Sequence, residues 1–371
     1  MRIAIIYDKV TKYGGAERVV EAIHEIWPNA PLFTLVSRSD TGKWASLYKI
    51  NTSFIQRIPF GKKYPELLSF MSPYAVEAYH FDSYDVVLTI TSSDFKGIIT
   101  SPKTLHICYC LTPTRYLWSG YHIYQDEPGI GLLNRFARVV MKALSVPMRY
   151  GDFISSQRPD NYIAISHTVA KRINYYYRRN CDILYPPVDL NVFRLPKKTK
   201  KGLYYLVVSR LVPYKKVDFV IKACNKLKLP LCVIGDGIDE KRLKKLAGTS
   251  IQFVRSDLTD EKLCWYYQNC LALIYPSEED FGLSAVEALA CGKPVIGYAR
   301  GGIGEIVQEG VNGLVYADQT PEVLEQTLQR FNGLIFSEHK CRDSVQKYSK
   351  KQFQSSLKRL IQNIIMKRKT L

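Results

Sequence analysis

Two carboxylates in the second half of the chain stand out because their neighbours are apolar. Glu279 and Glu287 have seven residues between them, and Glu287 is the only charged residue between Phe281 and Gly292. Burying an unpaired charge costs free energy, so a carboxylate on a helix that otherwise faces the core needs a partner. Ligand hydroxyl groups are suitable partners, because a carboxylate oxygen accepts their hydrogen bonds.

The segment around these carboxylates is predicted to place backbone N–H groups beside them. The apolar run at residues 271–275 indicates a buried strand, and a helix should follow from about Leu283 until Gly292 and Pro294 stop it. The N-terminus of such a helix attracts anions. Carboxylates and N–H donors at one strand end therefore suit a ligand that carries both hydroxyl and phosphate groups.

A basic loop offers a second feature that suits phosphate. Arg210 and Lys215 follow an apolar run at residues 203–208 and flank a proline turn at Pro213. Arginine presents a planar fork of donors and lysine a mobile point charge, so both can bind one diphosphate. A basic loop is more often merely solvated, but its place directly after a predicted strand favours a binding function.

These segments must be positioned by alternating strands and helices, which indicate an α/β fold. The first predicted strand leads to Gly14 and Gly15, a turn where phosphate can approach the backbone in a doubly wound sheet. Further strands are expected at residues 31–35, 85–90, 104–109 and 161–165 in the first half, and at 231–235, 251–254 and 295–298 in the second. Residues 51–84, which are rich in aromatic residues and proline, receive no assignment.

The central segment resembles the signature of the family 4 retaining glycosyltransferases, which have the GT-B fold. The resemblance rests on the spacing of the two glutamates and on motifs around and after them, and it extends to the start of the chain and the linker. These motifs are Phe281-Gly282-Leu283, Ala290-Cys291-Gly292-Lys293-Pro294-Val295, Gly301-Gly302-Ile303-Gly304-Glu305-Ile306-Val307 and Gly310-Val311-Asn312-Gly313-Leu314-Val315. Similar chains mostly build bacterial surface polysaccharides of the O-antigen or capsule type, among them mannosyltransferases.

The resemblance implies two Rossmann-like domains with a nucleotide-sugar donor in the cleft between them. Residues 1–185 would form the acceptor-side domain and residues 186–345 the nucleotide-sugar-binding domain, joined at the paired prolines Pro186 and Pro187. Residues 346–371 would form a basic amphipathic helix that packs back on the first domain.

The resemblance also implies a role for each predicted site residue. Arg210 and Lys215 would hold the donor diphosphate, Glu287 the ribose hydroxyls, and Glu279 the donor-sugar hydroxyls beside the reacting carbon; Glu279, Arg210 and Lys215 are the predicted catalytic residues. The other residues predicted to bind the donor are Gly14, Gly15, Phe281, Gly282, Leu283 and Ser284.

The expected reaction is retaining transfer of a hexose or 6-deoxyhexose from a GDP- or UDP-linked donor. The acceptor would be a glycan or a polyprenyl-diphosphate-linked sugar. The sequence has no Asp-x-Asp triplet to hold a divalent cation on the donor, so we expect no metal and no cofactor, with Arg210 and Lys215 in the place of the metal. Cations preorganised at a leaving diphosphate stabilise the charge that develops there.

One position departs from the family. Leu111 stands where relatives that make surface polysaccharides usually have a histidine that reaches the donor sugar. Three interpretations remain open: a donor without a 6-hydroxyl, whose methyl group suits leucine; a replacement polar group from elsewhere; or impaired catalysis. The third makes a GT-B binding protein the alternative function.

Composition limits the partners. The net charge of +18 fits binding to nucleic acid, an anionic membrane or a phosphate-rich substrate. The chain shows no nucleic-acid-binding module, which disfavours the first of these partners. The absence of a GxGxxG motif after the first strand disfavours an NAD-dependent enzyme. Nine cysteines without a CxxC pair predict reduced, structural thiols. The start of the chain reads as a strand and not as a signal peptide, which predicts a cytoplasmic protein.

Two amphipathic segments predict peripheral contact with the inner face of the cell membrane. Residues 131–148 alternate apolar side chains with Arg135, Arg138 and Lys142, and residues 344–371 carry basic but no acidic side chains beside an apolar stripe. A packed surface helix with solvated charges is the competing interpretation for the first segment, and we slightly prefer it.

Overall fold

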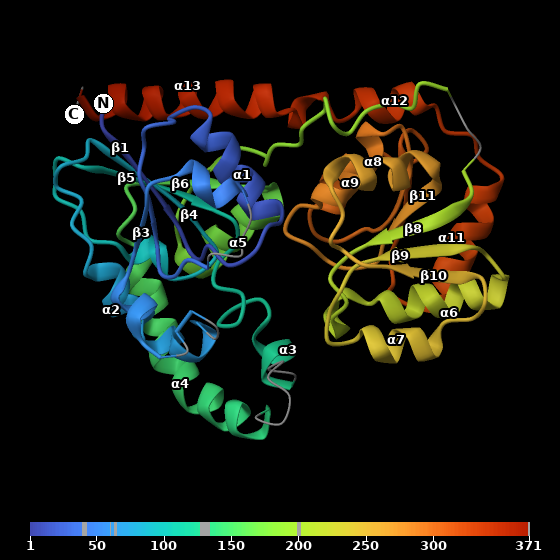
Figure 1. The fold of residues 1–371 in the computed structure, drawn as a ribbon, viewed down its shortest axis with the longest axis horizontal. Helices are drawn as coiled ribbons and strands as arrows, with labels where there is room; N and C mark the ends of the chain where they lie inside the picture. Colours follow the sequence, from blue (N-terminus) through green and yellow to red (C-terminus); the bar gives the residue numbers. More distant parts are fainter. Residues whose placement is uncertain (39–42, 60, 63–64, 127–133, 199–201, 370–371) are drawn as a thin grey trace. The chain divides into compact units, whose positions relative to one another are not determined.

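The computed structural model describes residues 1–38, 43–59, 61–62, 65–126, 134–198 and 202–369. The chain forms two compact units (Figure 1). Unit 1 comprises Met1–Pro186 and Phe353–Leu371, and unit 2 comprises Pro187–Gln352. The division between the units falls between the paired prolines of the predicted linker.

The described part of unit 1 contains a seven-stranded parallel sheet in the order β3-β2-β1-β4-β5-β6-β7. Its central strands are buried along their whole length, as expected of a parallel sheet covered on both faces. The strands are β1 Ile3–Tyr7, β2 Leu32–Thr34, β3 Ile50–Thr52, β4 Val86–Thr91, β5 Leu105–Cys110, β6 Asn161–Ala164 and β7 Asp182–Ile183.

Six α-helices and four short 3-10 helices connect and cover this sheet within the described residues. The α-helices are α1 Gly15–His24, α2 Ser72–Glu77, α3 Tyr121–Asp126, α4 Asn134–Ser155, α5 His167–Tyr177 and α13 Lys350–Lys369. The 3-10 helices are η1 Lys43–Leu47, η2 Phe54–Arg57, η3 Pro65–Met71 and η4 Asp94–Gly97. Residues 131–133, where the first predicted amphipathic helix begins, lie outside the described residues.

In the segment without a sequence assignment, residues 51–84, the described residues include the end of β3, short helices and an aromatic cluster. Phe33 of β2 makes edge-to-face contacts with Tyr79, Phe81 and Tyr84, at ring-centroid distances of 5.3, 5.1 and 6.0 Å. Aromatic pairs prefer this geometry. Ring packing therefore organises the segment, and ring packing leaves neither a two-residue nor a 3.6-residue period in the sequence.

The described part of unit 2 contains a six-stranded parallel sheet in the order β10-β9-β8-β11-β12-β13. Helices α8 and α9 lie on one face of this sheet and α6 and α7 on the other (Figure 1). The strands are β8 Tyr204–Val208, β9 Leu231–Ile234, β10 Ile251–Val254, β11 Cys270–Tyr275, β12 Val295–Tyr298 and β13 Gly313–Tyr316. The helices are η6 Pro213–Lys215, α6 Val217–Leu227, α7 Glu240–Leu246, α8 Asp260–Asn269, α9 Leu283–Ala290, α10 Ile303–Ile306, α11 Pro321–Asn332, α12 Glu338–Asp343 and η7 Gln346–Tyr348.

The strand orders confirm the prediction of two doubly wound sheets. In each sheet the order reverses once, between β1 and β4 in unit 1 and between β8 and β11 in unit 2. In open α/β sheets, ligands bind beyond the carboxyl ends of the strands at such a reversal. The loops that follow these four strands are therefore where the predicted site residues should lie.

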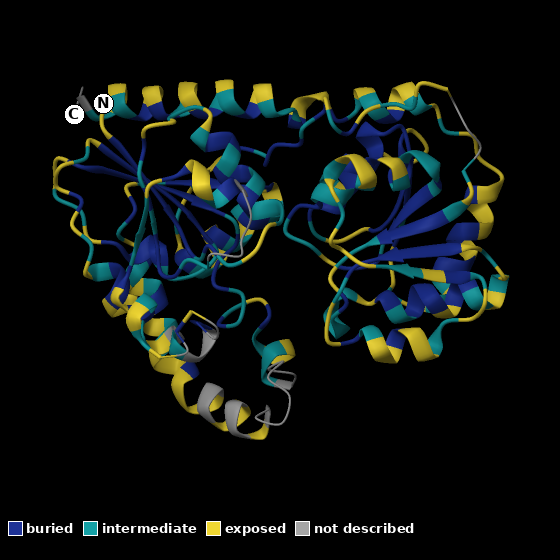
Figure 2. Cartoon of the chain, viewed as in Figure 1, coloured by how far each residue is buried: buried dark blue, intermediate teal, exposed yellow. Residues whose placement is uncertain are grey.

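Helix α13 packs its apolar stripe on unit 1, as predicted. Phe353, Leu357 and Ile361 are buried, and the Phe353 ring lies edge-to-face on Tyr109 of β5 at 5.9 Å. Gln354 Nε2 donates to the Ala22 carbonyl oxygen at 3.0 Å. The opposite side of the helix is exposed along its length (Figure 2).

Leu357→Ala should lower the free energy of unfolding of unit 1 by about 2–5 kcal/mol, because the side chain is fully buried and its removal leaves a cavity. Urea unfolding, followed by circular dichroism, measures this change. The control is Lys358→Ala on the exposed side of the same turn, which should shift stability by no more than about 0.5 kcal/mol. Equal effects of the two variants would contradict the packing of α13 on unit 1.

Candidate functional site

The basic loop after β8 meets the acidic loop after β11 in unit 2. Lys215, the last residue of η6, forms an ion pair with Glu279, and both side chains are mostly buried, at 12% and 14% exposure. The structure thus brings together two predicted site residues that are 64 positions apart in the sequence. Parallel pairing of β8 with β11 explains the contact, because both loops leave the same edge of the sheet.

Glu279 is held at both its side chain and its backbone. Ser277 Oγ donates to Glu279 Oε1 at 3.0 Å, and the Gly302 N–H donates to the Glu279 carbonyl oxygen at 2.8 Å. Gly301 adopts φ +77°, and a Cβ atom there would lie 2.4 Å from that carbonyl oxygen. The glycine turn after β12 therefore needs glycine so that it can lie against the loop carrying Glu279.

The N-terminus of α9 is formed by the remaining predicted donor-binding residues of unit 2. Gly282 caps the helix with φ +122°, a region that side chains rarely adopt, and its carbonyl accepts from the N–H groups of Ala285 and Val286 at 3.0 and 3.2 Å. The N–H groups of the first turn, at Leu283 and Ser284, precede this ladder, as at any helix start. The predicted start of this helix near Leu283 is confirmed, while binding of an anion there stays a prediction.

Glu287 is buried in α9, as predicted, and it has a protein partner. The side chain is 4% exposed, and the Tyr267 hydroxyl of α8 donates to Glu287 Oε2 at 2.8 Å. Tyr267 is itself fully buried. The sequence predicted that the carboxylate needs a partner, and the partner in this structure is a tyrosine that sequence reasoning missed.

Arg210 lies in the same basic loop, beside a second tyrosine. Its Nη2 donates to the Tyr214 hydroxyl, and the Tyr214 ring has the guanidinium of Arg210 at 5.9 Å and the ammonium of Lys215 at 5.5 Å. Cations are attracted to the face of an aromatic ring. Tyr214 therefore contacts both of the cations that are predicted to bind the diphosphate.

The glycine pair of unit 1 lies at the carboxyl end of β1, but its conformation does not require glycine. Gly14 caps α1 in extended backbone with φ −173°, which any residue adopts, and Gly15 begins the helix. Beside them the Tyr7 hydroxyl donates to Glu17 Oε1 at 2.6 Å. Burial raises the pKa of the Glu17 carboxyl, and the hydrogen bond from Tyr7 partly offsets this rise.

Two aspartates lie at the strand-order reversal of unit 1. Asp8 follows β1 and accepts from the Thr91 hydroxyl of β4 at 2.5 Å and from the Ser92 N–H at 2.7 Å. Asp94 begins η4, and burial raises the pKa of its carboxyl to about 6, although the ammonium of Lys96 opposes that rise. A carboxyl with this pKa changes charge near neutral pH.

The loop that carries Leu111 is fixed by a buried ion pair. Lys96 Nζ lies 2.6 Å from Asp152 Oδ1 and donates to Thr114 Oγ1 at 2.9 Å, while the Leu111 N–H donates to the Thr91 carbonyl oxygen at 2.8 Å. A buried pair is costly to break, because one unpartnered charge remains. Leu111 itself is half-buried at the carboxyl end of β5.

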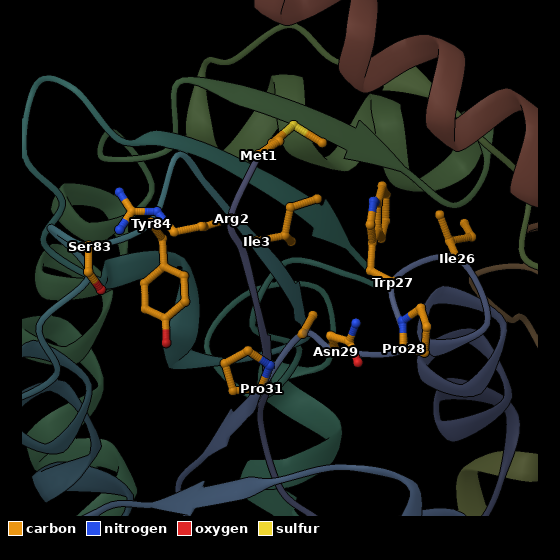
Figure 3. A pocket seen from close by; sticks show the side chains of 11 residues that line it. Met1, Arg2, Ile3, Ile26, Trp27, Pro28, Asn29, Pro31, Ser83 and Tyr84 are labelled. Atoms are coloured by element: carbon orange, nitrogen blue, oxygen red, sulfur yellow. The ribbon is translucent and has the colours of Figure 1, made fainter.

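A pocket elsewhere in unit 1 does not belong to this site. It has a volume of about 540 Å³ and is lined by residues that include Met1, Trp27, Pro31 and Tyr84 (Figure 3). These residues lie at the amino end of β1, whereas ligands of doubly wound sheets bind at the carboxyl ends. Among the residues the structure describes, no three His, Cys, Asp or Glu side chains gather as metal ligands.

Sequence reasoning missed several polar residues that lie in or near the candidate site of each unit. They are Asp8, Asp94, Lys96 and Asp152 in unit 1, and Tyr214, Tyr267 and Ser277 in unit 2. Position alone could have indicated Asp8 and Asp94, which stand directly after or near a strand end. No sequence signal marks Tyr267, because its partner is 20 residues away on another helix.

The second half of the chain is similar to a known family. Residues 191–352 match the family described as "Glycosyl transferases group 1". An uncharacterised glycosyltransferase of Methanocaldococcus jannaschii is 29% identical over 189 residues, which are 50% of this chain and 53% of that protein. The chain thus spans about half the length of this curated relative.

Two solved structures share the whole architecture. The chain resembles HepE of Anabaena, solved in complex with UDP, with a TM-score of 0.70 and 16% identity over 98% of this chain and 100% of the other. It also resembles the lipopolysaccharide outer core galactosyltransferase WaaB, with a TM-score of 0.65 and 17% identity over 98% and 99% of the two chains. Residues 191–352 are thus similar to the group 1 glycosyltransferases, and the fold of the chain is GT-B.

Proposed function

We propose that the protein transfers a sugar from a nucleotide-diphosphate donor to a glycan or a lipid-linked acceptor. The observation that carries the proposal is the pairing of Lys215 with Glu279 at the reversal of strand order in unit 2, beside the N-terminus of α9. This arrangement supplies a cation and N–H donors for a diphosphate, and a carboxylate for sugar hydroxyls.

Departure of the diphosphate is the chemical step that these groups assist. Breaking the bond between the sugar and the diphosphate leaves negative charge on the phosphate oxygens and positive charge on the sugar ring. Lys215 and Arg210 stabilise the negative charge on the phosphate oxygens, and the Glu279 carboxylate orients the sugar hydroxyls. Because these groups are held in place before the reaction, little reorganisation is needed. Retention of configuration follows from the family resemblance.

The donor nucleotide is proposed to bind with its ribose on Glu287. The Tyr267 hydrogen bond at 2.8 Å orients this carboxylate and offsets the cost of its burial. HepE, whose fold the chain shares, was solved with UDP, which supports a uridine-linked donor as the first to test, with GDP the alternative. Phe281, Gly282, Leu283 and Ser284 would contribute the helix N-terminus, while a donor contact at Gly14 and Gly15 stays a prediction.

The acceptor is proposed to belong to surface-polysaccharide synthesis. The resemblance of the sequence to O-antigen and capsule enzymes supports this, as does the structural likeness to a lipopolysaccharide core galactosyltransferase. The site needs no metal in this proposal, because Arg210 and Lys215 take over the neutralisation of the diphosphate.

Peripheral contact with the inner face of an anionic membrane is proposed through α4. Basic Arg138 and Lys142 are exposed on this helix together with Val139, Val146 and Tyr150, which are 69%, 67% and 71% exposed. Much of α4 is coloured as exposed in Figure 2. Apolar and basic side chains on one exposed helix suit an anionic lipid surface. Within the described residues, no helix combines the length and apolar character that crossing a bilayer requires.

Leu111 supports a second candidate function, a nucleotide-sugar-binding protein with reduced or lost catalysis. The two functions differ in one measurement, the release of free nucleotide from donor with and without acceptor. Release of UDP from UDP-linked sugars in the presence of a lipid-linked acceptor supports transfer. Binding of UDP without release from any UDP- or GDP-linked sugar supports the second candidate.

Lys215→Met should weaken UDP binding roughly 10- to 100-fold, because a charge-assisted contact to the diphosphate contributes about 1.5–3 kcal/mol. Isothermal titration calorimetry measures the change. The control is Lys216→Met, which removes the same charge from the neighbouring exposed position and should leave the affinity within about twofold. Equal losses in both variants would mean that net charge, and not a built site, binds UDP.

Glu279→Gln should leave UDP affinity unchanged or increase it, since UDP has no sugar and the substitution releases Lys215 from its ion pair. Turnover with the complete donor should fall about 100-fold or more, because the contact to the sugar is lost at the reacting carbon. Normal turnover of Glu279→Gln would refute its assigned role.

Tyr267→Phe should weaken UDP binding about fivefold, because Glu287 loses the hydrogen bond that orients it, a contribution of about 1 kcal/mol. Pyrophosphate, which lacks ribose, should bind Tyr267→Phe and the wild-type protein equally. The matched control is Tyr266→Phe, which removes a hydroxyl group from the neighbouring tyrosine. A loss of pyrophosphate affinity in Tyr267→Phe would show a general disturbance of unit 2 and not a ribose contact.

Leu111→His tests the preference for a 6-deoxy donor. The imidazole replaces an apolar side chain that suits a methyl group, so activity with a 6-deoxyhexose donor should stay unchanged or fall. The assay compares 6-deoxy and 6-hydroxylated donors side by side. A large gain with the 6-hydroxylated donor would contradict the preference.

A further inference from the structure

Two thiols lie against each other inside unit 2, next to the candidate site. Cys264 of α8 and Cys291, which caps α9, have their Sγ atoms 3.6 Å apart. Cys264 is one turn before Tyr267, and Cys291 is one turn after Glu287, so the two thiols and the Tyr267–Glu287 hydrogen bond join the same two helices. The proposed transfer reaction uses neither thiol.

The two thiols differ in acidity. A hydrogen bond from the Cys291 thiol lowers the pKa of Cys264 to about 7, and the positive side chains of Arg194 and Arg342 favour the same ionised form against the cost of burial. Burial and the neighbouring Cys264 raise the pKa of Cys291 well above its usual value. Cys264 is therefore the nucleophile of the pair, and Cys291 keeps its proton.

The positive charge beside Cys264 is fixed in place. Arg342 donates to three backbone carbonyl oxygens, those of Leu190, Phe193 and Ala290. A guanidinium bonded in this way cannot swing away from the thiol pair, so the thiolate of Cys264 keeps its favourable surroundings in the folded protein.

Cys264 also has an approach for a small oxidant. It lines a pocket of about 690 Å³ in unit 2, together with residues that include Arg194, Glu261, Trp265 and Gln268. Cys291 is fully buried and does not line this pocket. An oxidant that enters this pocket therefore meets Cys264 first.

We propose that Cys264 and Cys291 form an oxidation site at which a small hydroperoxide produces an intramolecular disulfide. The Cys264 thiolate attacks the peroxide, the O–O bond breaks, and Cys264 becomes a sulfenic acid while the alkoxide or hydroxide leaves. The Cys291 sulfur then attacks the Cys264 sulfur, its proton goes to the departing oxygen, and water is released. The two thiols are oxidised by two electrons, and the peroxide is reduced by two electrons.

The geometry requires only a short movement. A disulfide has an S–S length of about 2.05 Å, so the sulfur atoms must approach by roughly 1.5 Å, which rotation of the two side chains can supply in part. The bond would link α8 to α9 by a covalent bridge near their existing hydrogen bond. Cytosolic disulfides are usually transient redox features and not structural ones, which fits a pair that is reduced at rest.

The test is peroxide treatment of the reduced full chain, followed by peptide mapping without reductant. No lysine or arginine separates Cys264 from Cys291, so trypsin leaves them on one peptide and chymotrypsin must be used to separate them. We expect a Cys264–Cys291 linked peptide that dithiothreitol removes. A disulfide between another pair, or oxidation without a disulfide, would overturn the proposal.

Three variants assign the roles. Cys291→Ser should accumulate a sulfenic acid at Cys264 that dimedone traps, and Cys264→Ser should lose the reaction. Cys181→Ser is the control: Cys181 is more exposed, but burial and Asp182 raise the pKa of its thiol to about 11, so its loss should not slow disulfide formation. We expect Cys264 to react at pH 7.5 at least about tenfold faster than Cys181. A faster reaction at Cys181, or wild-type peroxide consumption by Cys264→Ser, would contradict the assignment.

Discussion

Parallel pairing of β8 with β11 is the constraint on which the candidate site depends. The pairing aligns Leu206 with Leu273, so the two strands end at the same edge of the sheet and the loops that follow them begin side by side. Because the order of strands reverses between them, the connecting helices leave in opposite directions and do not cover this edge. Lys215 and Glu279 meet there as an ion pair. The glycine turn that follows the next strand, β12, packs against the loop that carries Glu279. A cation, a carboxylate and a helix N-terminus thus gather without any single segment providing all three.

Burial of Glu287 is the second constraint, and it explains why α8 matters to a site that lies on other elements. A carboxylate in an apolar helix costs free energy unless it is hydrogen-bonded, and Tyr267 supplies that bond from α8. The same two helices carry the thiols of Cys264 and Cys291. A change in the packing of α8 on α9 should therefore affect the position of the Glu287 carboxylate, which is proposed to bind the ribose.

Much of this organisation was predictable from local pattern. The helix from Leu283 and the strand before it follow from apolar periodicity and from the stop at Gly292, whereas the return of the last helix to the first domain is implied by the family resemblance. The structure confirms all three. The aromatic segment at residues 51–84 was not predictable, because packing between rings distant in sequence organises it. The Tyr267–Glu287 and Lys96–Asp152 contacts were not predicted for the same reason. The residues in contact are 20 and 56 positions apart in the sequence, and only the tertiary fold brings them together. The roles of the predicted residues toward a donor stay predictions.

Backbone hydrogen exchange with and without saturating UDP tests the central claim most directly, because it locates the ligand without assuming which side chains bind it. The account predicts slower exchange in two segments of unit 2, residues 209–217 after β8 and residues 279–286 at the start of α9. It predicts no change at residues 26–31 and 83–84, which line the pocket at the amino end of β1. Protection at that pocket, or no protection after β8 and β11, would contradict the account.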